Sequence, residues 1–476
     1  MFVGLDMGTS VAKAAVFAED GAATRVASTP VPPPGSDGQV DVEEVVRAAA
    51  HVLSAVCDGR APDLVALTGQ GDGLWLVDAE GRPVRPALSW LDDRAADLVS
   101  GWLADGTGDR LYRHTGNVLF PGSSGPLMAW LDRHDPRSLD AAATAAHCKD
   151  VLHLRLTGER GTDVSDASVP FLDPHTRAWS DTVLKTLGLE HRAGLLPPIA
   201  ATLPYGAAHG RLAGLRPGTP VTSGPYDLPA CALGAGVTEP GDGLLIVGTT
   251  LACEVVVDAL DFTGEPVGFH LATARPDRHL RALPAMTGTA ALDWVLGITG
   301  TAHDQVSGML DESPPGAHGV AALPYFSPSG ERAPFVDPAA RAEFTGLDLR
   351  ATRADLVRAV CEAVAFAARN CLEAAGLTGT LTVCGGGTRS LPWLRLFADV
   401  LGRPLRVARG PEPGARGAVL AGLAAHATEL PGKAVDFEAW TKPDAVVDPV
   451  LERVAFYEQA YADYLTRVAQ ARTRWR

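Results

Sequence analysis

A single carboxylate, Asp227, stands in the segment SGPYDLPACALGAG at residues 223–236, whose other residues are small, apolar or turn-forming. A charged side chain in such surroundings is costly unless it has a partner or a function. An aspartate with an unperturbed pKa of about 3.9 is ionised at pH 7 and can accept a proton. Asp227 also precedes an apolar stretch that contains Pro229, a pattern typical of a helix N-cap. The segment alone leaves three roles open: general base, metal ligand and structural acid.

A second group of polar residues lies in a turn near the N-terminus. The segment MFVGLDMGTSVAKAAVFAED predicts a strand at residues 2–5, a polar turn at 6–10 and a second strand at 11–17. A turn that contains Gly8, Thr9 and Ser10 exposes amides and hydroxyls, and its glycine allows close approach of a phosphate. Asp6 could be an ordinary acid of a turn, and Lys13 a solvated residue of the second strand.

This pattern returns 240 residues later in GDGLLIVGTTLACEVVV, residues 241–257. Residues 8–12 (GTSVA) align without a gap with residues 248–252 (GTTLA), and apolar strands flank both turns. The repeat predicts two domains built on the same plan. Two Gly-Thr turns that arose independently remain the alternative.

Composition excludes several classes of protein. The chain has 476 residues, 46% hydrophobic and 20% charged, which indicates two or three globular domains. A net charge of −15 without a Lys/Arg-rich run argues against a nucleic-acid partner. The seven cysteines are scattered and form no Cys-x-x-Cys pair, so we expect neither a disulfide framework nor a zinc site. With no signal peptide and no long apolar run, we expect a cytoplasmic protein without a membrane partner.

Periodicity places the remaining motifs on α/β elements. We expect strands in DLVALTGQ and LTVCGGG, and helices near 92–104, 126–134, 354–375 and 447–472. Gly376 is expected to end the third of these helices, and Ser390 to cap a helix that follows the second strand. No low-complexity linker separates these elements.

Taken together and in order, these segments resemble the FGGY family of carbohydrate kinases, which transfer the γ-phosphate of ATP to a sugar or polyol hydroxyl. The resemblance covers nearly the whole chain and rests on nine segments. They are GLDMGTSVAKAAVF, GQGDGLWLVDAEGRPVRPALSWLDDR, KDVLHLRLTGERGTDVSDAS, GPYDLPACALGAG, GTT at 248–250, GERAP, FTGLDLRATRADLVRAVCEAVAF, CGGGTRS and GARGAVLAG.

The resemblance implies an α/β fold of two ribonuclease-H-like domains, as in actin and hexokinase, with an interdomain cleft. We expect residues 1–238 to bind the sugar and to carry the first phosphate hairpin and the catalytic aspartate. Residues 239–476 are expected to bind the nucleotide. ATP and Mg²⁺ are the implied cofactors, and the implied partner is a small sugar or polyol, with a homodimer left as an option.

The resemblance also assigns roles to single residues. Asp227 becomes the general base, and Asp6 and Asp227 the residues near Mg²⁺, an ion for which one or two carboxylates suffice. The expected nucleotide-binding residues are Gly8, Thr9, Ser10, Lys13, Gly248, Thr249, Gly288, Gly386, Gly387 and Ser390. A dinucleotide site in CGGGTRS is the competing interpretation, but it requires a third glycine where Ser390 stands and an acid where Arg409 stands.

The expected substrate segment is Gly69-Gln70-Gly71-Asp72-Gly73. Xylulose kinases of the family tend to have Gly-Gln-Met-His-Gly here, and glycerol kinases Asn-Gln-Arg-Glu-Thr. Asp72 could accept hydrogen bonds from two adjacent hydroxyls, and Gly71 leaves room beside it. An Asp-Gly hairpin turn is the competing interpretation.

We therefore predict an ATP-dependent kinase of a small polyol, similar to erythritol, or of a ketopentose, similar to xylulose. The expected substrate-binding residues are Gln70, Gly71, Asp72, Trp90 and Asp227. Two alternatives remain at this stage: a catalytically inactive nucleotide-binding regulator on the same fold, and a nicotinamide-dependent dehydrogenase.

Overall fold

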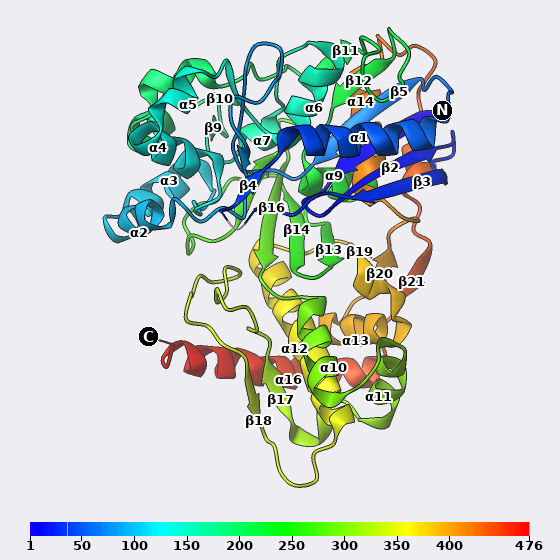
Figure 1. Cartoon of the computed structure of the whole chain (residues 1–476). Helices are drawn as coiled ribbons and strands as arrows, with labels where there is room; N and C mark the ends of the chain where they lie inside the picture. Colours follow the sequence, from blue (N-terminus) through cyan, green and yellow to red (C-terminus); the bar gives the residue numbers. More distant parts are fainter. Residues whose placement is uncertain (36, 476) are drawn as a thin grey trace. The chain divides into compact units, whose positions relative to one another are not determined.

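Both predicted Gly-Thr hairpins form, and each lies in a different unit of the molecule. The computed structural model describes residues 1–35 and 37–475. Unit 1 comprises Met1–Gly236, Asp258–Leu280 and Arg409–Lys442, and unit 2 comprises Val237–Val257, Arg281–Ala408 and Pro443–Arg476 (Figure 1). Each unit is an α/β structure with its own mixed sheet.

The sheet of unit 1 has the strand order β11-β12-β5-β1-β2-β3. The strands are β1 (Phe2–Met7), β2 (Val11–Phe17), β3 (Ala23–Pro30), β5 (Leu64–Gly69), β11 (Tyr205–Ala207) and β12 (Pro220–Ser223). Strands β1, β5 and β12 run parallel, and β1 pairs with β2 in an antiparallel hairpin. The carboxyl ends of the three parallel strands therefore meet at one edge of the sheet, which is where ligands bind in open α/β sheets.

Two helices cover the two faces of this sheet. Side chains alternate along β1, so Val3, Leu5 and Met7 pack with α1 (Val42–Cys57), while Phe2 packs on the other face with α14 (Pro413–Ala425). Figure 1 shows α1 beside strands β2 and β3. The order helix, sheet, helix gives unit 1 a core on each side of the sheet.

The remaining elements of unit 1 lie mostly between β5 and β12 in the sequence. The helices are α2 (Ala96–Ala104), α3 (Thr107–Thr115), α4 (Ser124–His134), α5 (Pro136–Asp140), α6 (Cys148–Thr157), α7 (Val164–Ala167), α8 (Asp181–Leu187), α9 (Asp227–Gly234) and α15 (Phe437–Thr441). The short strands are β4 (Gln39–Val40), β6 (Trp75–Val77), β7 (Ala87–Leu88), β8 (Thr144–Ala146), β9 (Leu172–Asp173), β10 (Ala178–Trp179) and β15 (Phe269–Ala272). The helix predicted near 92–104 is shorter than expected and begins at Ala96.

The sheet of unit 2 follows the same plan around the second hairpin. Its strands lie in the order β16-β14-β13-β19-β20-β21. They are β13 (Gly243–Val247), β14 (Leu251–Val257), β16 (His279–Ala285), β19 (Leu381–Cys384), β20 (Leu405–Val407) and β21 (Ala445–Val447). Strand β13 is antiparallel to β14 and parallel to β19, as β1 is to β2 and β5. The repeat inferred from the sequence is therefore a repeat of structure.

Unit 2 also contains five main helices and two short strands. The helices are α10 (Thr289–Thr299), α11 (Val306–Glu312), α12 (Arg353–Ala375), α13 (Leu391–Leu401) and α16 (Leu451–Arg472), and the strands are β17 (Ala321–Leu323) and β18 (Glu343–Thr345). Helix α12 matches its predicted range and ends at Gly376, whose φ of 94° suits glycine. The helix predicted at 447–472 begins instead at Leu451, because residues 445–447 pair with β20 as β21.

The described residues include every cysteine of the chain. All seven cysteines are free, and six of them are buried. None of the described helices is long and apolar enough to cross a membrane.

Candidate active site

Asp227 lies where the chain enters α9 from the end of β12. It is the first residue of the helix, and the N-cap position belongs to Tyr226. The N-cap interpretation of Asp227 is therefore wrong: no side chain caps α9, and the carboxylate lies in the first helical turn. An acid in this turn interacts favourably with the helix dipole, and the Asp227 side chain remains partly exposed.

Hydrogen bonds from two other elements fix the segment that leads into Asp227. The Thr68 hydroxyl at the end of β5 donates to the Pro225 carbonyl oxygen at 2.7 Å. The backbone amide of Tyr226 donates to Ser165 Oγ on α7 at 3.1 Å. The position of Asp227 is thus set by β5 and α7 as well as by β12.

A buried lysine lies behind this segment. Lys149, at the start of α6, is fully buried, and its Nζ lies 2.9 Å from a carboxylate oxygen of each of Asp150, Asp163 and Asp166. Burial alone would lower the pKa of Lys149, but the three carboxylates raise it well above its usual value. The ammonium is therefore charged, and it compensates carboxylates that would otherwise be costly to bury.

The Lys149 cluster is connected to the segment before Asp227 at two points. The Ser223 hydroxyl donates to Asp150 Oδ1 at 3.0 Å. The Ser165 hydroxyl, which accepts from the backbone before Asp227, donates to Asp163 Oδ2 at 2.6 Å. The cluster therefore supports the residues that precede Asp227.

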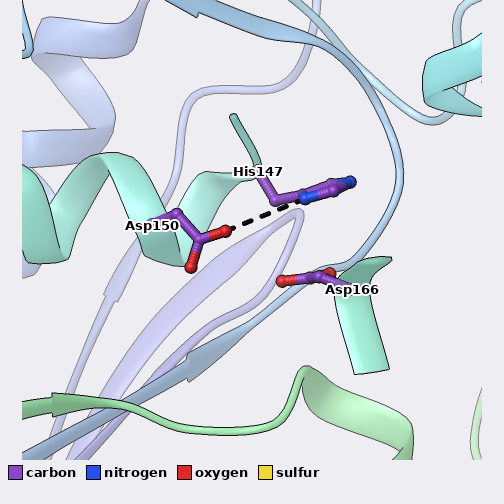
Figure 2. A group of neighbouring side chains, drawn as sticks. All are labelled: His147, Asp150 and Asp166. Carbon is purple, nitrogen blue, oxygen red and sulfur yellow. Dashed lines mark ion pairs between the residues drawn. The ribbon is translucent and has the colours of Figure 1, made fainter. Parts of the chain in front are cut away.

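His147 borders the same cluster, and Figure 2 shows it with Asp150 and Asp166. The three side chains offer ligand atoms within 4.8 Å of one another, a spacing compatible with a metal ion. Burial alone would lower the pKa of His147, but the Asp166 and Asp150 carboxylates raise it to about 9. Because His147 is then cationic at neutral pH and Lys149 Nζ already contacts both carboxylates, the cluster carries its own positive charge. We assign no metal to it.

Asp6 lies at the carboxyl end of β1, next to the start of α14. A methyl group added at Gly414 would lie 2.8 Å from Asp6 Oδ2, so this glycine permits the close approach. Burial and the Glu412 carboxylate raise the pKa of Asp6 to about 6, and Lys13 opposes them. Lys13, across the hairpin from Asp6, pairs with Glu412 at 3.2 Å.

Hydrogen bonds connect the first hairpin turn to two of the expected substrate-binding residues. Trp90 Nε1 donates to Thr9 Oγ1 at 2.8 Å, and Thr9 Oγ1 donates to Gln70 Oε1 at 3.0 Å. Gly8 and Ser10 lie in the same turn, where Ser10 is exposed. Residues predicted to contact phosphate and residues predicted to contact substrate are therefore neighbours.

The expected substrate segment adopts an unusual backbone conformation. Asp72 has a φ of 58° and Gly73 a φ of 71°, both in the left-handed region. The Gly73 amide donates to the Gly122 carbonyl oxygen at 3.0 Å. The hairpin interpretation is wrong, because β5 pairs with β1 and β12 while β6 pairs with β8. The left-handed turn instead follows the end of β5 at Gly69 and includes Asp72.

The pKa of Asp227 differs from the value assumed from the sequence. Burial raises it well above 3.8, and the negative charges of Asp6, Asp166 and Asp72 raise it further, against a hydrogen bond from the Leu228 amide. The charges of Asp6 and Asp72 are therefore close enough to Asp227 to affect its pKa. They also correct the expectation of an unperturbed carboxylate. A carboxylate whose pKa is raised is a stronger proton acceptor once it is ionised.

In unit 2, the expected phosphate residues gather at the end of β13. The Gly288 amide donates to the Thr249 carbonyl oxygen at 2.9 Å, just before α10. A methyl group at Gly288 would lie 2.5 Å from the Gly248 carbonyl oxygen, so only glycine allows this contact. The Thr249 side chain is exposed.

The glycine segment after β19 lies beside the same strand. A methyl group at Gly387 would meet the Val247 side chain, whereas Gly386 faces open space. Ser390 caps α13 as expected, since its side chain accepts from the Trp393 amide. In unit 2, Gly248, Thr249 and Gly288 are thus in contact, and Gly387 lies beside the strand that precedes them.

Comparisons with known proteins identify the family. The model of the FGGY family of carbohydrate kinases, N-terminal domain, matches residues 1–234, and that of the C-terminal domain matches residues 268–426. The chain belongs to the FGGY family of carbohydrate kinases. The expectation drawn from the sequence motifs is confirmed, and membership of a kinase family implies the use of ATP.

Relatives of this FGGY chain include an erythritol kinase and xylulose kinases. It is 33% identical to the erythritol kinase of Brucella abortus over 98% of this chain and 95% of the relative. It is 31% identical to the xylulose kinase of Escherichia coli over 87% of each chain. The crystal structure of xylulose kinase from Rhodospirillum rubrum, 27% identical, matches with a TM-score of 0.88 over 99% of both chains. The predicted fold class, two α/β domains of the actin and hexokinase type, is confirmed.

Sequence reasoning missed the residues that support the FGGY site from behind. No role was predicted for Lys149, Asp163, Ser165, Asp166 or Tyr226. A signal was present, because the segment at 149–168 combines charged residues with apolar helix positions. The missing information was that Lys149, Asp150, Asp163 and Asp166 are buried and connect to the segment before Asp227. Such long-range contacts cannot be read from spacing.

Proposed function

We propose that this chain transfers the γ-phosphate of ATP to a hydroxyl of a small neutral polyol or ketose, with Asp227 as the general base. The observation that carries the proposal is the position of Asp227. It begins a helix, the two residues before it form hydrogen bonds with Thr68 of β5 and Ser165 of α7, and Asp6 and Asp72 contribute to its raised pKa. Phosphoryl transfer depends mainly on positioning and on charge neutralisation, with a base to accept the hydroxyl proton.

The two hairpin turns are proposed to bind the phosphates of ATP. In unit 1 the turn offers the Gly8 and Ser10 backbone and the Thr9 hydroxyl, and in unit 2 it offers Gly248 and Thr249, supported by Gly288. Lys13 is the weakest member of this set, because its ammonium is paired with Glu412. Gly386, Gly387 and Ser390 are proposed to bind the adenosine.

Asp6 and Asp227 are proposed to hold Mg²⁺ with the nucleotide. The donors suit the ion, because Mg²⁺ prefers carboxylate oxygens and takes one or two of them. Burial and negative neighbours raise the pKa of both carboxyls, and a bound cation would stabilise their ionised forms. When bound, the ion would supply positive charge to the phosphates.

The acceptor is proposed to be neutral and to carry several hydroxyls. Gln70, Asp72 and Trp90 are proposed to offer polar atoms to the acceptor hydroxyls. The room expected beside Gly71 is absent, because the Tyr226 ring lies against this glycine. The negative charges of Asp6, Asp72 and Asp166, which help to raise the pKa of Asp227, would also repel an anionic acceptor such as an aldonate. The similarity to erythritol and xylulose kinases supports a four-carbon polyol or a five-carbon ketose.

Neither the inactive nucleotide-binding regulator nor the nicotinamide-dependent dehydrogenase has a specific observation in its favour. The relatives named above are kinases, which gives no support to an inactive regulator, and the glycine segment after β19 resembles the family's nucleotide site. The division into domains 1–238 and 239–476, the homodimer and the cytoplasmic location stay predictions.

The proposal is tested by acceptor-dependent release of ADP. The purified protein would be incubated with Mg·ATP and with erythritol, xylulose, glycerol or gluconate. We expect release with erythritol or xylulose and little with gluconate. ADP release that no acceptor stimulates, or a preference for gluconate, would contradict the proposal.

A further inference from the structure

Gly71 and the ring of Tyr226 lie in direct contact. A methyl group added at Gly71 would lie 2.8 Å from Cδ2 and 3.0 Å from Cε2 of Tyr226, closer than side chains approach one another. Gly71 is not among the residues with a positive φ, so its backbone conformation does not require glycine. What requires glycine at position 71 is the Tyr226 ring.

The Tyr226 ring cannot move away easily. It is buried, with 4% of its surface exposed, and its backbone amide is bound by Ser165. On the other side, the substrate segment is fixed by the bonds from the Gln70 amide to Met7 and from the Gly73 amide to Gly122. Both partners of the contact are therefore held in place.

The contact joins the two segments on which the reaction depends. Tyr226 directly precedes Asp227, the proposed base, and Gly71 directly precedes Asp72, a proposed substrate ligand. The Tyr226 ring occupies the volume that a side chain at position 71 would otherwise fill. We propose that Tyr226, seated against Gly71, is the residue that limits the length of the acceptor. This inference rests on the proposed function and names a specificity-determining residue for it.

The test compares a short and a longer acceptor. In Tyr226→Leu the flat ring is lost, and we expect the ratio of kcat/KM for xylulose to that for erythritol to rise about tenfold, the effect of a change in pocket size of roughly one methylene. Tyr226→Phe keeps the ring and should keep the wild-type ratio. Gly71→Ala should lower kcat/KM for both acceptors, and Gly71→Ala/Tyr226→Leu should recover most of that loss.

Two controls separate specificity from structure. Gly101→Ala adds the same methyl group on α2 with no atom within 4 Å and should leave both acceptors unaffected. Thermal unfolding of each variant monitors the fold. A Tyr226→Leu protein that loses activity equally toward both acceptors, or a Gly71→Ala protein with wild-type kinetics, would overturn the inference.

Calorimetric binding of erythritol and xylulose without nucleotide distinguishes the inference from the proposed function. Wild-type protein that binds these acceptors but never phosphorylates them would contradict the proposed function alone. If Tyr226→Leu then keeps the wild-type ratio of the two affinities, or if the wild-type protein binds neither acceptor, the inference about Tyr226 fails.

Discussion

At the scale of the residue, Ser165 is a hydroxyl whose role is to position others. It accepts from the Tyr226 amide and donates to Asp163, and so connects the backbone before Asp227 to the Lys149 cluster. We predict that Ser165→Ala lowers kcat roughly fivefold, because one hydrogen bond is worth about 1 kcal/mol, while the KM for ATP stays within about twofold. Steady-state kinetics at saturating acceptor would measure the difference.

Ser168→Ala is the matched control for this prediction. Ser168 is buried near Ser165, but its hydroxyl bonds to the Val164 carbonyl oxygen and the Ala272 amide, away from Asp227. It should lose stability without the selective loss of kcat, and Ser165→Thr, which keeps the hydroxyl, should restore turnover. Equal kinetic effects of Ser165→Ala and Ser168→Ala would show that Ser165 has no positioning role.

Candidate site residues that carry a local sequence signal could be proposed from the sequence, and those that depend on distant contacts could not. Asp227, Asp6 and the Gly-Thr turns carry their signal in adjacent residues, where a charge or a glycine is unusual. The role of Tyr226 has no such signal, because its partner Gly71 is 155 positions away in the chain. The raised pKa of Asp227 was missed for the same reason: its charged neighbours come from separate segments.

At the scale of the element, the start of α12 is stabilised by a capping box whose acid, Asp355, also contacts Ser313 and His318. Asp355 accepts from the Thr352 amide and hydroxyl at 2.9 and 2.8 Å, and also from Ser313 at 2.6 Å. His318 Nδ1 lies 2.9 Å from it. Burial alone would raise the pKa of Asp355, but these hydrogen bonds lower it below its usual value. The ionised form is therefore the form that stabilises the helix.

This arrangement predicts an acid-sensitive step in stability. A lowered pKa contributes stability that is present above the unfolded-state value, about 3.9, and is lost as pH falls from there through the folded-state value. We expect Asp355→Asn to be less stable than the wild type by about 1 kcal/mol at pH 7 and the difference to shrink below about pH 4. Thermal unfolding of both proteins across this range tests the prediction, and a difference that is independent of pH would contradict it.

A helix could be predicted where apolar residues kept helical spacing up to a residue that ends helices. Helix α12 matched its predicted range because its apolar residues recur at helical spacing up to Gly376. The start of α16 was misplaced because residues 445–447 gain strand structure only by pairing with β20, a contact that local periodicity does not encode.

At the scale of the whole molecule, two units repeat one plan: a hairpin with a Gly-Thr turn and a parallel strand beside it, with the predicted site residues at the carboxyl ends of the strands. The order of motifs was enough to predict this plan and the family. It was not enough to predict that residues 409–442, near the end of the chain, pack in unit 1 with the first hairpin, where α14 reaches Asp6.

The central claim is that Asp227 removes the proton from the acceptor hydroxyl during phosphoryl transfer. The most direct test is the turnover of Asp227→Asn with saturating Mg·ATP and the best acceptor, because asparagine keeps the shape of the side chain but cannot accept the proton. We predict that kcat falls by about 10²–10⁴-fold, with a much smaller change in the KM for the acceptor and an intact thermal transition. A folded Asp227→Asn protein that retains near-wild-type kcat would contradict the account.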